Sequence, residues 1–443
     1  MLLKLTVENF FSFRDKTTYF MGANSGRKFA ARLLQHPAVK KRILPASAVF
    51  GGDGSGCENF ARTLRFFKQL VTESPSFVNS LNLYTFQNHS DSRELPVKMW
   101  IELAAADGAW HYGFMALKDV IVYERLVRLS RSQKTQLFER RKKKLKLHRS
   151  VEGQEELRAL FRAMPKSLLF LPHATRGGNP QFQEVYDWFR DTLHVTGQDS
   201  YVHQPQGSGE GHTASRAFHD FVELIDKNSH AARLDARAVP PDSPARQALE
   251  AEGGVTRAGD YLIRRVPGGG GFEVYYRHRS FHGAKLLQLF PYDQSGRWDH
   301  FPVMRPFASE REKHSLVALM SAADIMASAG PKVYFINYFD SAFDPIQART
   351  VISDYLDSRS RDSRTQLIIT SSNALLLDKK VFRPDELWIA EQGDYGNTRL
   401  LSMGEYKKTL KQKPVWKNFK TARIGGIYTP LLMAALEAGQ ERK

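Results

Sequence analysis

A glycine-rich segment near the N-terminus has the residue types and spacing of a phosphate-binding loop. It reads Gly51-Gly52-Asp53-Gly54-Ser55-Gly56-Cys57-Glu58-Asn59. A P-loop needs Gly, four residues, Gly, Lys and then Ser or Thr. Its glycines let backbone N–H groups surround the phosphates, its lysine neutralises them, and its hydroxyl holds Mg²⁺. Gly51 and Gly56 have this spacing, so the chemistry that the segment predicts is nucleotide binding.

The two side chains that should carry that chemistry are replaced. Cys57 stands at the lysine position and Glu58 at the Ser/Thr position. A carboxylate about 4 Å from a phosphate repels it by several kcal/mol at an effective dielectric constant near 20. We therefore expect a triphosphate to bind poorly here. A reactive thiol at Cys57 is a weaker alternative, since a helix N-terminus can lower the pKa of a cysteine.

The elements around the loop follow from hydrophobic periodicity. Residues 46–50 form a short apolar run, and Phe60, Leu64, Phe67 and Leu70 lie on one face of a predicted helix. A P-loop occurs between a strand and a helix in this way. An ordinary glycine turn would have the same composition, but this context favours a P-loop relic.

The rest of the chain predicts a mixed architecture. Alternating residues predict antiparallel strands over 1–20 and 83–148, and apolar runs predict buried strands at 332–337 and 366–370 with a helix over 346–358 between them. Strands that alternate with helices are typical of the α/β class. Residues 228–271, rich in proline and glycine, are expected to be a loop-rich insertion.

Composition limits the partners. The 443 residues carry a formal charge of +17 and a single cysteine, which excludes an intrachain disulfide and a thiolate metal cluster. The histidines lack paired ligand spacing, so no metal site is predicted. There is no uncharged apolar run of about 18 residues, and we expect a cytoplasmic protein without a membrane partner.

The charge favours a polyanionic partner such as DNA or RNA. A basic tract lies at a predicted hairpin tip and is either a solvated charge run or a phosphate-contact patch. Its candidate nucleic-acid-binding residues are Arg140, Arg141, Lys142, Lys143, Lys144 and Lys146.

Several segments resemble one family in order along the chain. Val7-Glu8-Asn9-Phe10-Phe11-Ser12-Phe13-Arg14-Asp15 resembles the opening strand pair of the AAA-type ATP-binding proteins of abortive-infection systems, relatives of SMC, RecF and ABC ATPase heads. The glycine loop resembles their Gly-Asn-Ala-Ser-Gly-Lys-Ser-Asn element, with Asn59 retained. Pro384-Asp385-Glu386-Leu387-Trp388 and Gly425-Gly426-Ile427-Tyr428 resemble the family's C-terminal end.

The resemblance implies a dimer that sandwiches ATP between the P-loop of one subunit and the signature helix of the other. It also identifies further replaced groups. Asn337 and Tyr338 stand where the Asp and Glu of Walker B should hold Mg²⁺ and orient water, and Asp340 keeps the D-loop position. The signature position after Ser309 holds Arg311 in place of glycine, and Ser372 replaces the switch histidine. Lys28, Lys41 or Arg42 could substitute for the missing lysine.

The predicted fold class is α/β, an ABC/SMC-head-like P-loop NTPase fold with an antiparallel β subdomain and a helical insertion. Residues 1–80 are assigned to the N-terminal part of the ATPase-like lobe, 81–150 to the antiparallel subdomain, 151–285 to the helical or loop-rich insertion, and 286–443 to the C-terminal part of the lobe.

We expect a pseudo-ATPase without catalytic residues that acts as a scaffold or sensor subunit, in bacterial antiphage defence. Its partner would be a second copy, an active ATPase or an effector nuclease. The alternatives are a basic nucleic-acid-binding protein and an ATPase with an atypical or partner-completed site. No cofactor is expected, and ATP with Mg²⁺ is doubtful.

Overall fold

The computed structural model describes the chain in separate ranges. These are residues 1–52, 54–72, 85–106, 108–118, 120–196, 330–339, 345–378, 380–393 and 395–404, with the strand segments 233–239, 255–258, 261–265, 272–277, 284–290 and 305–306.

The first sheet is antiparallel and has seven strands in the order β2-β1-β4-β5-β6-β7-β8. Their bounds are β1 Leu2–Glu8, β2 Thr17–Phe20, β4 Val97–Ala104, β5 Ala109–Leu117, β6 Val120–Leu129, β7 Lys134–Arg141 and β8 Lys144–Leu147. On β4, buried residues alternate with half-buried ones, so one face of this sheet packs on the core and the other meets solvent.

The second sheet is mixed, with six strands in the order β19-β18-β3-β17-β16-β9. Their bounds are β3 Ala46–Phe50, β9 Leu193–Thr196, β16 Lys332–Ile336, β17 Thr365–Ser371, β18 Leu387–Gln392 and β19 Thr398–Ser402. All neighbouring pairs are parallel except β18 with β19. Strands β3, β16 and β17 are buried along their whole length, which explains their continuous apolar runs.

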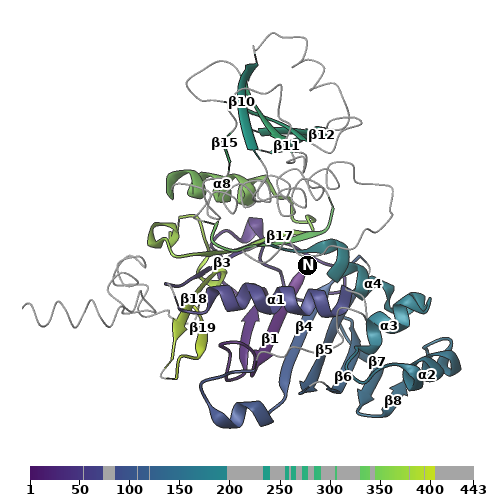
Figure 1. Cartoon of the computed structure of the whole chain (residues 1–443). Coiled ribbons are helices and arrows are strands. Elements are labelled where there is room, and N and C mark those ends of the chain that lie inside the picture. The colour runs from purple at the N-terminus through teal and green to yellow at the C-terminus, as the bar shows by residue number, and fades with distance from the viewer. Residues whose placement is uncertain are drawn as a thin grey trace, which may run out of the picture.

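Helix α1 (Cys57–Thr72) lies between the two sheets, and helix α8 (Pro345–Ser358) covers the far face of the mixed sheet (Figure 1). The ring of Phe60 on α1 lies 4.9 Å from that of Tyr19 in the first sheet and 5.2 Å from that of Phe335 in the second. On the other side, Ile352 and Tyr355 of α8 join a separate buried cluster with the mixed sheet. The glycine loop thus begins α1 where the mixed sheet and the helix meet.

The shorter elements complete the lobe. The helices are α2 Gln154–Ala163, α3 Phe170–Arg176 and α4 Gln183–Asp187, followed by a π-helical turn at Trp188–Thr192. The 3₁₀ turns are η1 Ala30–Arg32, η2 Ser90–Glu94, η3 Pro180–Phe182, η6 Ala374–Leu376 and η7 Pro384–Glu386. None of the helices in these ranges is long and apolar enough to cross a membrane.

The α/β class, the antiparallel sheet and the predicted hairpins are confirmed, but the assigned boundaries differ from the strand pairing. β1 and β2 were assigned to the lobe of residues 1–80, yet β1 pairs with β4, Leu5 opposite Ile101. Alternating residues predict that a segment is a strand but do not predict which strand it pairs with. The boundary predicted from the sequence therefore separated strands that share one sheet.

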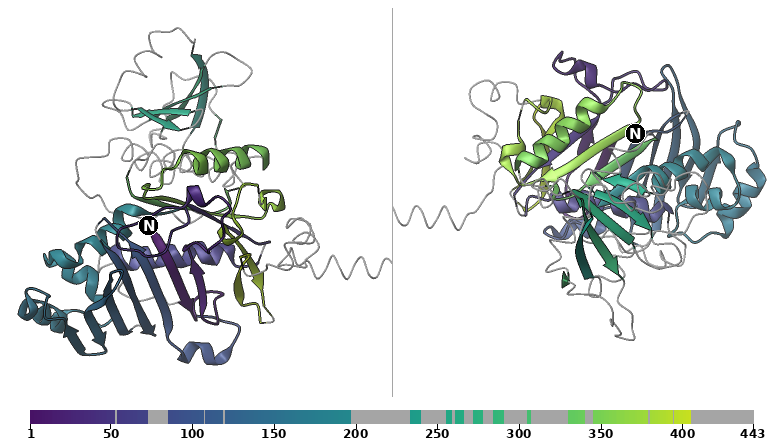
Figure 2. Two further views of the ribbon diagram at one scale, coloured as in Figure 1. Left: turned by 180° about the vertical axis from the view of Figure 1, so that it is seen from behind. Right: turned by 90° about the horizontal axis from the view of Figure 1, so that it is seen from above.

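The interpretation of 228–271 as loop-rich is wrong for its described segments. β10 Arg233–Val239, β11 Val255–Ala258, β12 Tyr261–Arg265, β13 Phe272–Arg277, β14 Ala284–Phe290 and β15 Arg305–Pro306 form a third, antiparallel sheet (Figure 2). Among the described residues of 151–285, the helices lie before Leu193 and strands follow it, and residue 285 falls inside β14. The many prolines and glycines lie mostly between these short strands and hid them.

Candidate functional site

The glycine loop joins β3 to α1, where the sequence predicted a P-loop. Gly51 donates its N–H to Ser371 O at 3.2 Å, which ties the loop to the end of β17. Gly54 and Gly56 have positive φ values of 80° and 99°, a region in which residues with a Cβ are strained. Both glycines are therefore needed for the path of the backbone.

The space inside the loop is filled by two of its own side chains. A Cβ at Gly51 would lie 2.1 Å from Ser55 Oγ and 2.8 Å from Cys57 Sγ. Ser55 Oγ donates to Cys57 Sγ at 3.5 Å, and both residues are buried. Since a phosphate has to enter the concave side of such a loop, these side chains compete with it for the same space.

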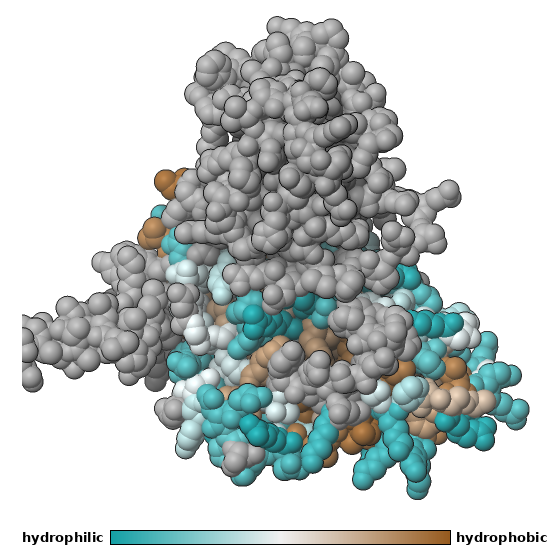
Figure 3. Space-filling view, viewed as in Figure 1, coloured by the Kyte–Doolittle hydropathy of each residue, from teal (hydrophilic) through white to brown (hydrophobic). Residues whose placement is uncertain are grey.

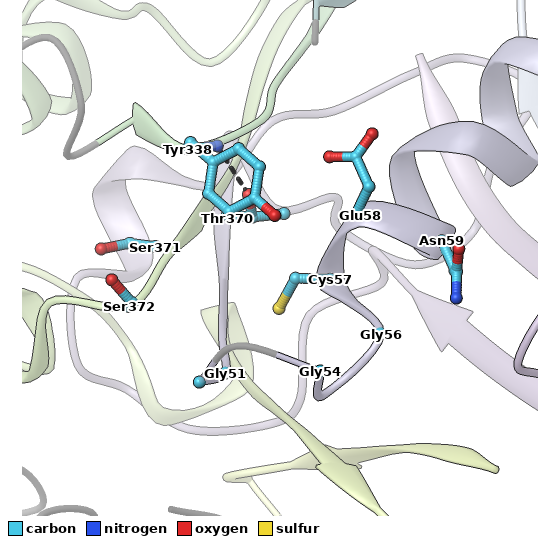
Figure 4. Close-up of a pocket in the computed structure, with 11 residues that line it drawn as sticks. Gly51, Gly54, Gly56, Cys57, Glu58, Asn59, Tyr338, Thr370, Ser371 and Ser372 are labelled. Carbon is cyan, nitrogen blue, oxygen red and sulfur yellow. Dashed lines mark hydrogen bonds between the residues drawn. The ribbon is translucent and has the colours of Figure 1, made fainter. Parts of the chain in front are cut away.

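The clearest feature of the site is a chain of hydrogen bonds that begins at Tyr338 and ends at Glu58. The Tyr338 N–H donates to Thr370 Oγ1 at 2.8 Å, and that hydroxyl donates to Asn337 Oδ1 at 2.6 Å. Asn337 Nδ2 donates in turn to Glu58 Oε2. Figure 4 shows Glu58 on the first turn of α1, on the same side of the pocket as Tyr338, in the turn after β16, and Thr370 on β17.

The two ends of the chain determine its direction. A backbone N–H can only donate, and a carboxylate can only accept. With Tyr338 donating at one end and Glu58 accepting at the other, the Asn337 amide has its oxygen toward Thr370 and its nitrogen toward Glu58. At the position where the resemblance predicts the Walker B acid, the Asn337 amide therefore presents a donor, not a metal-binding oxygen, to the glycine-loop side.

The remaining charge near Glu58 comes from its own helix. Arg62 Nε lies 3.4 Å from Glu58 Oε1, one helical turn further along α1. Lys28 and Lys41, considered as replacements for the missing lysine, instead lie 4.9 Å from the rings of Phe29 and Phe20 respectively. Among the described residues that line it, the glycine-loop side of the site thus carries a carboxylate and no lysine.

The pocket beside the loop is small. Its volume is about 110 Å³, below the roughly 300–1,000 Å³ of common small-molecule sites. Its described lining contains no lysine, arginine or histidine and consists of Gly51, Gly52, Gly54, Gly56, Cys57, Glu58, Asn59, Tyr338, Thr370, Ser371 and Ser372. In the ranges that the structure covers, no cluster of three or more His, Cys, Asp or Glu residues could hold a metal ion.

A hairpin closes the other side of the loop. Thr398 on β19 donates its hydroxyl to Ser55 O at 3.0 Å and contacts the Ser12 hydroxyl at 2.7 Å. Asn59 Nδ2 donates to the same Ser12 Oγ at 2.8 Å. A Cβ at Gly56 would lie 1.8 Å from Thr398 Oγ1, so the hairpin fits directly against the loop backbone.

The structure brings most of the predicted nucleotide-site residues together. Gly51, Gly54, Gly56, Cys57, Glu58, Asn59, Tyr338 and Ser372 line one pocket, Ser55 lies inside the loop, and Asn337 bonds to Glu58. Ser309, Arg311 and Asp340 lie outside the described residues. Thr370 was missed as a site residue, although its position at the end of an apolar strand just before Ser371 and Ser372 was a usable signal.

The basic tract contains one residue that does not belong to an exposed patch. Arg140 is 2% exposed, lies 3.5 Å from Glu124 and donates to Leu168 O at 2.5 Å. Residues 141–144 and Lys146 are exposed, and hydrophilic residues predominate over α2 and β8 at the lower right of Figure 3. A run of charges does not distinguish the two faces of a strand, which is why Arg140 was grouped with its neighbours.

Comparison with known proteins adds little to this geometry. No protein-family model matches the chain, and no curated protein matches it. Among solved structures, the SMC head domain from Thermotoga maritima is similar at 13% sequence identity with a TM-score of 0.33, over 90% of this chain and 98% of that one.

Proposed function

We propose that this chain is a catalytically degenerate P-loop ATPase that acts by binding partners and not by hydrolysing ATP. The observation that carries the proposal is the hydrogen bond from Asn337 to Glu58. In a working P-loop ATPase, the P-loop Ser/Thr and the Walker B Asp hold Mg²⁺. Here the residues at those two positions hold each other.

The electrostatics of the site support the same conclusion. Phosphoryl transfer depends almost entirely on positioned positive charge around the phosphates. Cys57 supplies none, and Glu58 adds a negative charge that Arg62 offsets from the helix side. The residues present do not fit a Mg²⁺–triphosphate, and no catalytic step is assigned to them.

Restoring the three lost groups should restore binding. The variant Cys57→Lys/Glu58→Ser/Asn337→Asp supplies the lysine, the hydroxyl and the acid, and removes the Glu58 carboxylate. By isothermal titration with ATP and Mg²⁺, we expect the native chain to bind more weakly than about 1 mM and the variant to bind at least tenfold more tightly, a gain of about 1.4 kcal/mol. Asn337→Asp alone serves as the control, because it adds an acid but keeps Glu58.

A phosphate-release assay tests whether the native chain hydrolyses ATP. Turnover by the native chain that disappears when Glu58 or Asp340 is changed would contradict a degenerate site. Tight binding of ATP and Mg²⁺ by the native chain would also contradict the proposal, and would favour an atypical or partner-completed site instead.

An ATPase fold that no longer hydrolyses ATP can still bind other proteins. Its surfaces remain available for protein contacts after catalysis is lost, and the family resemblance of the chain leads us to propose a scaffold or sensor subunit in bacterial antiphage defence. The partner would be a second copy, an active ATPase or an effector nuclease. Size-exclusion chromatography with light scattering, alone and with the products of neighbouring genes, tests this role. A strict monomer that binds none of them would contradict it.

A further inference from the structure

The outer face of the seven-stranded sheet, the face turned away from α1, carries aromatic and basic side chains. Met99 and Ile101 on β4 are buried toward the core, so Trp100 between them lies on the outer face. The pairing register places His111, Tyr123, Arg125 and Arg141 on that same face. In the left view of Figure 2, no described helix covers these strands.

These five residues form a continuous stack, which we call the aromatic ladder. The Trp100 ring is stacked on His111 at 5.4 Å and 10°, and it lies 5.8 Å from the Tyr123 ring. The guanidinium of Arg125 lies 5.4 Å from the centre of Trp100, and that of Arg141 lies 5.4 Å from Tyr123. The ladder is half-buried except for the exposed Arg141.

Gly113 makes room for the ladder. It lies directly opposite Trp100 on β4 and Arg125 on β6. A Cβ at Gly113 would lie 2.6 Å from Trp100 Cε3, so the indole covers the position where a side chain would otherwise project. The missing side chain allows rings from β4 and β6 to meet across β5.

The charges on this face leave an excess of cations. The three carboxylates there are paired: Glu8 with Lys98 at 2.6 Å, Glu102 with Lys4 at 3.3 Å, and Glu139 with Arg141 at 2.8 Å. No carboxylate within the described ranges lies within 4 Å of the remaining cations, Arg125, Lys144 and Lys146. Lys144 and Lys146 lie on β8, next to the β7 end of the ladder, because Lys144 is opposite Arg141 and Lys146 is opposite Glu139.

We propose that the outer face binds single-stranded nucleic acid. Trp100 and Tyr123 would stack with unpaired bases, and Arg125, Lys144 and Lys146 would contact phosphates. Aromatic rings interleaved with cations on an open sheet suit unpaired bases, whose flat faces are exposed, and not a duplex, whose bases are stacked inside. From β4 to β7 the ladder spans three strand spacings, about 14 Å, which is room for more than one base.

A hollow beside the β7–β8 hairpin, at the far end of β7 from Arg141, fits the same ligand. It has a volume of about 310 Å³ and is lined by Gln133, Lys134, Thr135, Gln136, Lys146, Leu147 and His148, which belong to β7, β8 and the residues next to them. Lys146 therefore belongs both to the face and to the hollow, which extends the path for a phosphate backbone past the edge of the sheet. The proposal uses no residue of the glycine loop, so it can fail or hold independently of the pseudo-ATPase proposal.

The stacking part is tested with fluorescently labelled 20-mer oligothymidylate and oligouridylate in anisotropy titrations of the full chain. We expect Trp100→Leu and Tyr123→Leu each to weaken binding about tenfold or more, as loss of a base–aromatic stack does. Tyr395→Leu is the matched control, because Tyr395 is 59% exposed and lies in the turn between β18 and β19, off this face. Circular dichroism checks that each variant is folded.

The predicted phosphate contacts are tested separately, with variants of the lysines. Lys144→Gln/Lys146→Gln changes only exposed side chains, and should make the slope of log affinity against log salt shallower by about 1.4, for two lost single-strand phosphate contacts. Arg158→Gln/Arg162→Gln on α2 removes the same charge elsewhere and should leave the slope nearly unchanged.

Three results would overturn the proposal. The first is no binding of either oligonucleotide at low salt. The second is tighter binding of a 20-base-pair duplex than of the single strands. The third is an equal change in the salt slope for Lys144→Gln/Lys146→Gln and Arg158→Gln/Arg162→Gln, which would indicate attraction by net charge alone. If the chain binds as proposed, the tighter of the two oligonucleotides identifies whether DNA or RNA is the preferred ligand.

Discussion

Asn337 and Glu58 are 279 residues apart in sequence, and each satisfies the hydrogen-bonding demand that the other creates. Arg62 offsets the charge of the Glu58 carboxylate at Oε1, and Asn337 donates to its other oxygen, Oε2. Together with Thr370 they form a complete donor–acceptor chain, which requires no ion. The pair therefore joins the first turn of α1 to the residue that follows β16 through side-chain hydrogen bonds.

A charge change at Asn337 tests this pairing. Asn337→Asp would place two carboxylates in contact, and we expect a loss of about 2 kcal/mol in the free energy of unfolding at pH 7. Adding Glu58→Gln should recover most of the loss, because the amide that it introduces can donate to the new acid. Urea denaturation measures both variants. If the double variant is no more stable than the single one, the two side chains do not interact as described.

Glu386 provides a test by pH. Burial raises the pKa of this carboxyl to about 8, only partly offset by the Arg383 N–H that donates to Glu386 Oε2 at 2.7 Å. The folded state thus holds a proton that the unfolded state releases above its pKa of about 4.3. The contribution of Glu386 to the free energy of unfolding should therefore be greatest below about pH 4.5. It should then decline up to pH 8, by about 1.4 kcal/mol per pH unit at most.

Glu386→Gln keeps an oxygen for the Arg383 N–H and removes the titration. Unfolding curves from pH 5 to pH 8 should be flatter for this variant than for the native chain, and the variant should be the more stable of the two at pH 8. A native stability that rises over that range, with the same slope in the variant, would show that Glu386 is not the group responsible.

Among the structural elements, the segment before α3 depends most on buried charge. Glu124 on β6 accepts N–H groups from Phe170 at 2.6 Å and Leu171 at 3.0 Å, while Arg140 on β7 donates to Leu168 O. Burial raises the pKa of Glu124, and the guanidinium of Arg140 opposes that rise. The ion pair thus fastens residues 168–171 to the inner face of the first sheet.

Removing Arg140 from its ion pair with Glu124 should lower the free energy of unfolding. Arg140→Met leaves Glu124 buried and unpaired, and we expect a loss of about 3–5 kcal/mol in the free energy of unfolding. Arg141→Met, the adjacent residue on the opposite and exposed face, should cost less than about 1 kcal/mol. Thermal or urea unfolding compares the two. Similar losses would mean that the position of Arg140 in the core has been misassigned.

For the whole molecule, the sequence predicted elements better than their partners. The apolar runs of β3, β16 and β17 and the helical face of α1 were readable, because burial on both faces or on one stripe leaves a periodic trace. That β1 pairs with β4 was not readable, since hairpins are favoured by proximity and this pair is separated by about 90 residues of chain. The strands β10 to β14 were hidden by the prolines and glycines between them.

The site was predictable to a similar extent. The sequence placed Cys57, Glu58 and Asn337 in one predicted site, because a P-loop specifies residue types at fixed positions, and the structure brings Glu58 and Asn337 together. The bond between Glu58 and Asn337 depends on how α1 and β16 are placed, which a motif does not encode. The burial of Arg140 depended on strand register in the same way.

The most direct test of the whole account is an experimental structure of crystals soaked with ATP and Mg²⁺ at millimolar concentration. We predict that Asn337 will still donate to Glu58, with Ser55 and Cys57 filling the loop and no nucleotide density beside residues 51–59. Clear density for a metal-coordinated triphosphate there, with Glu58 turned away from Asn337, would contradict the account.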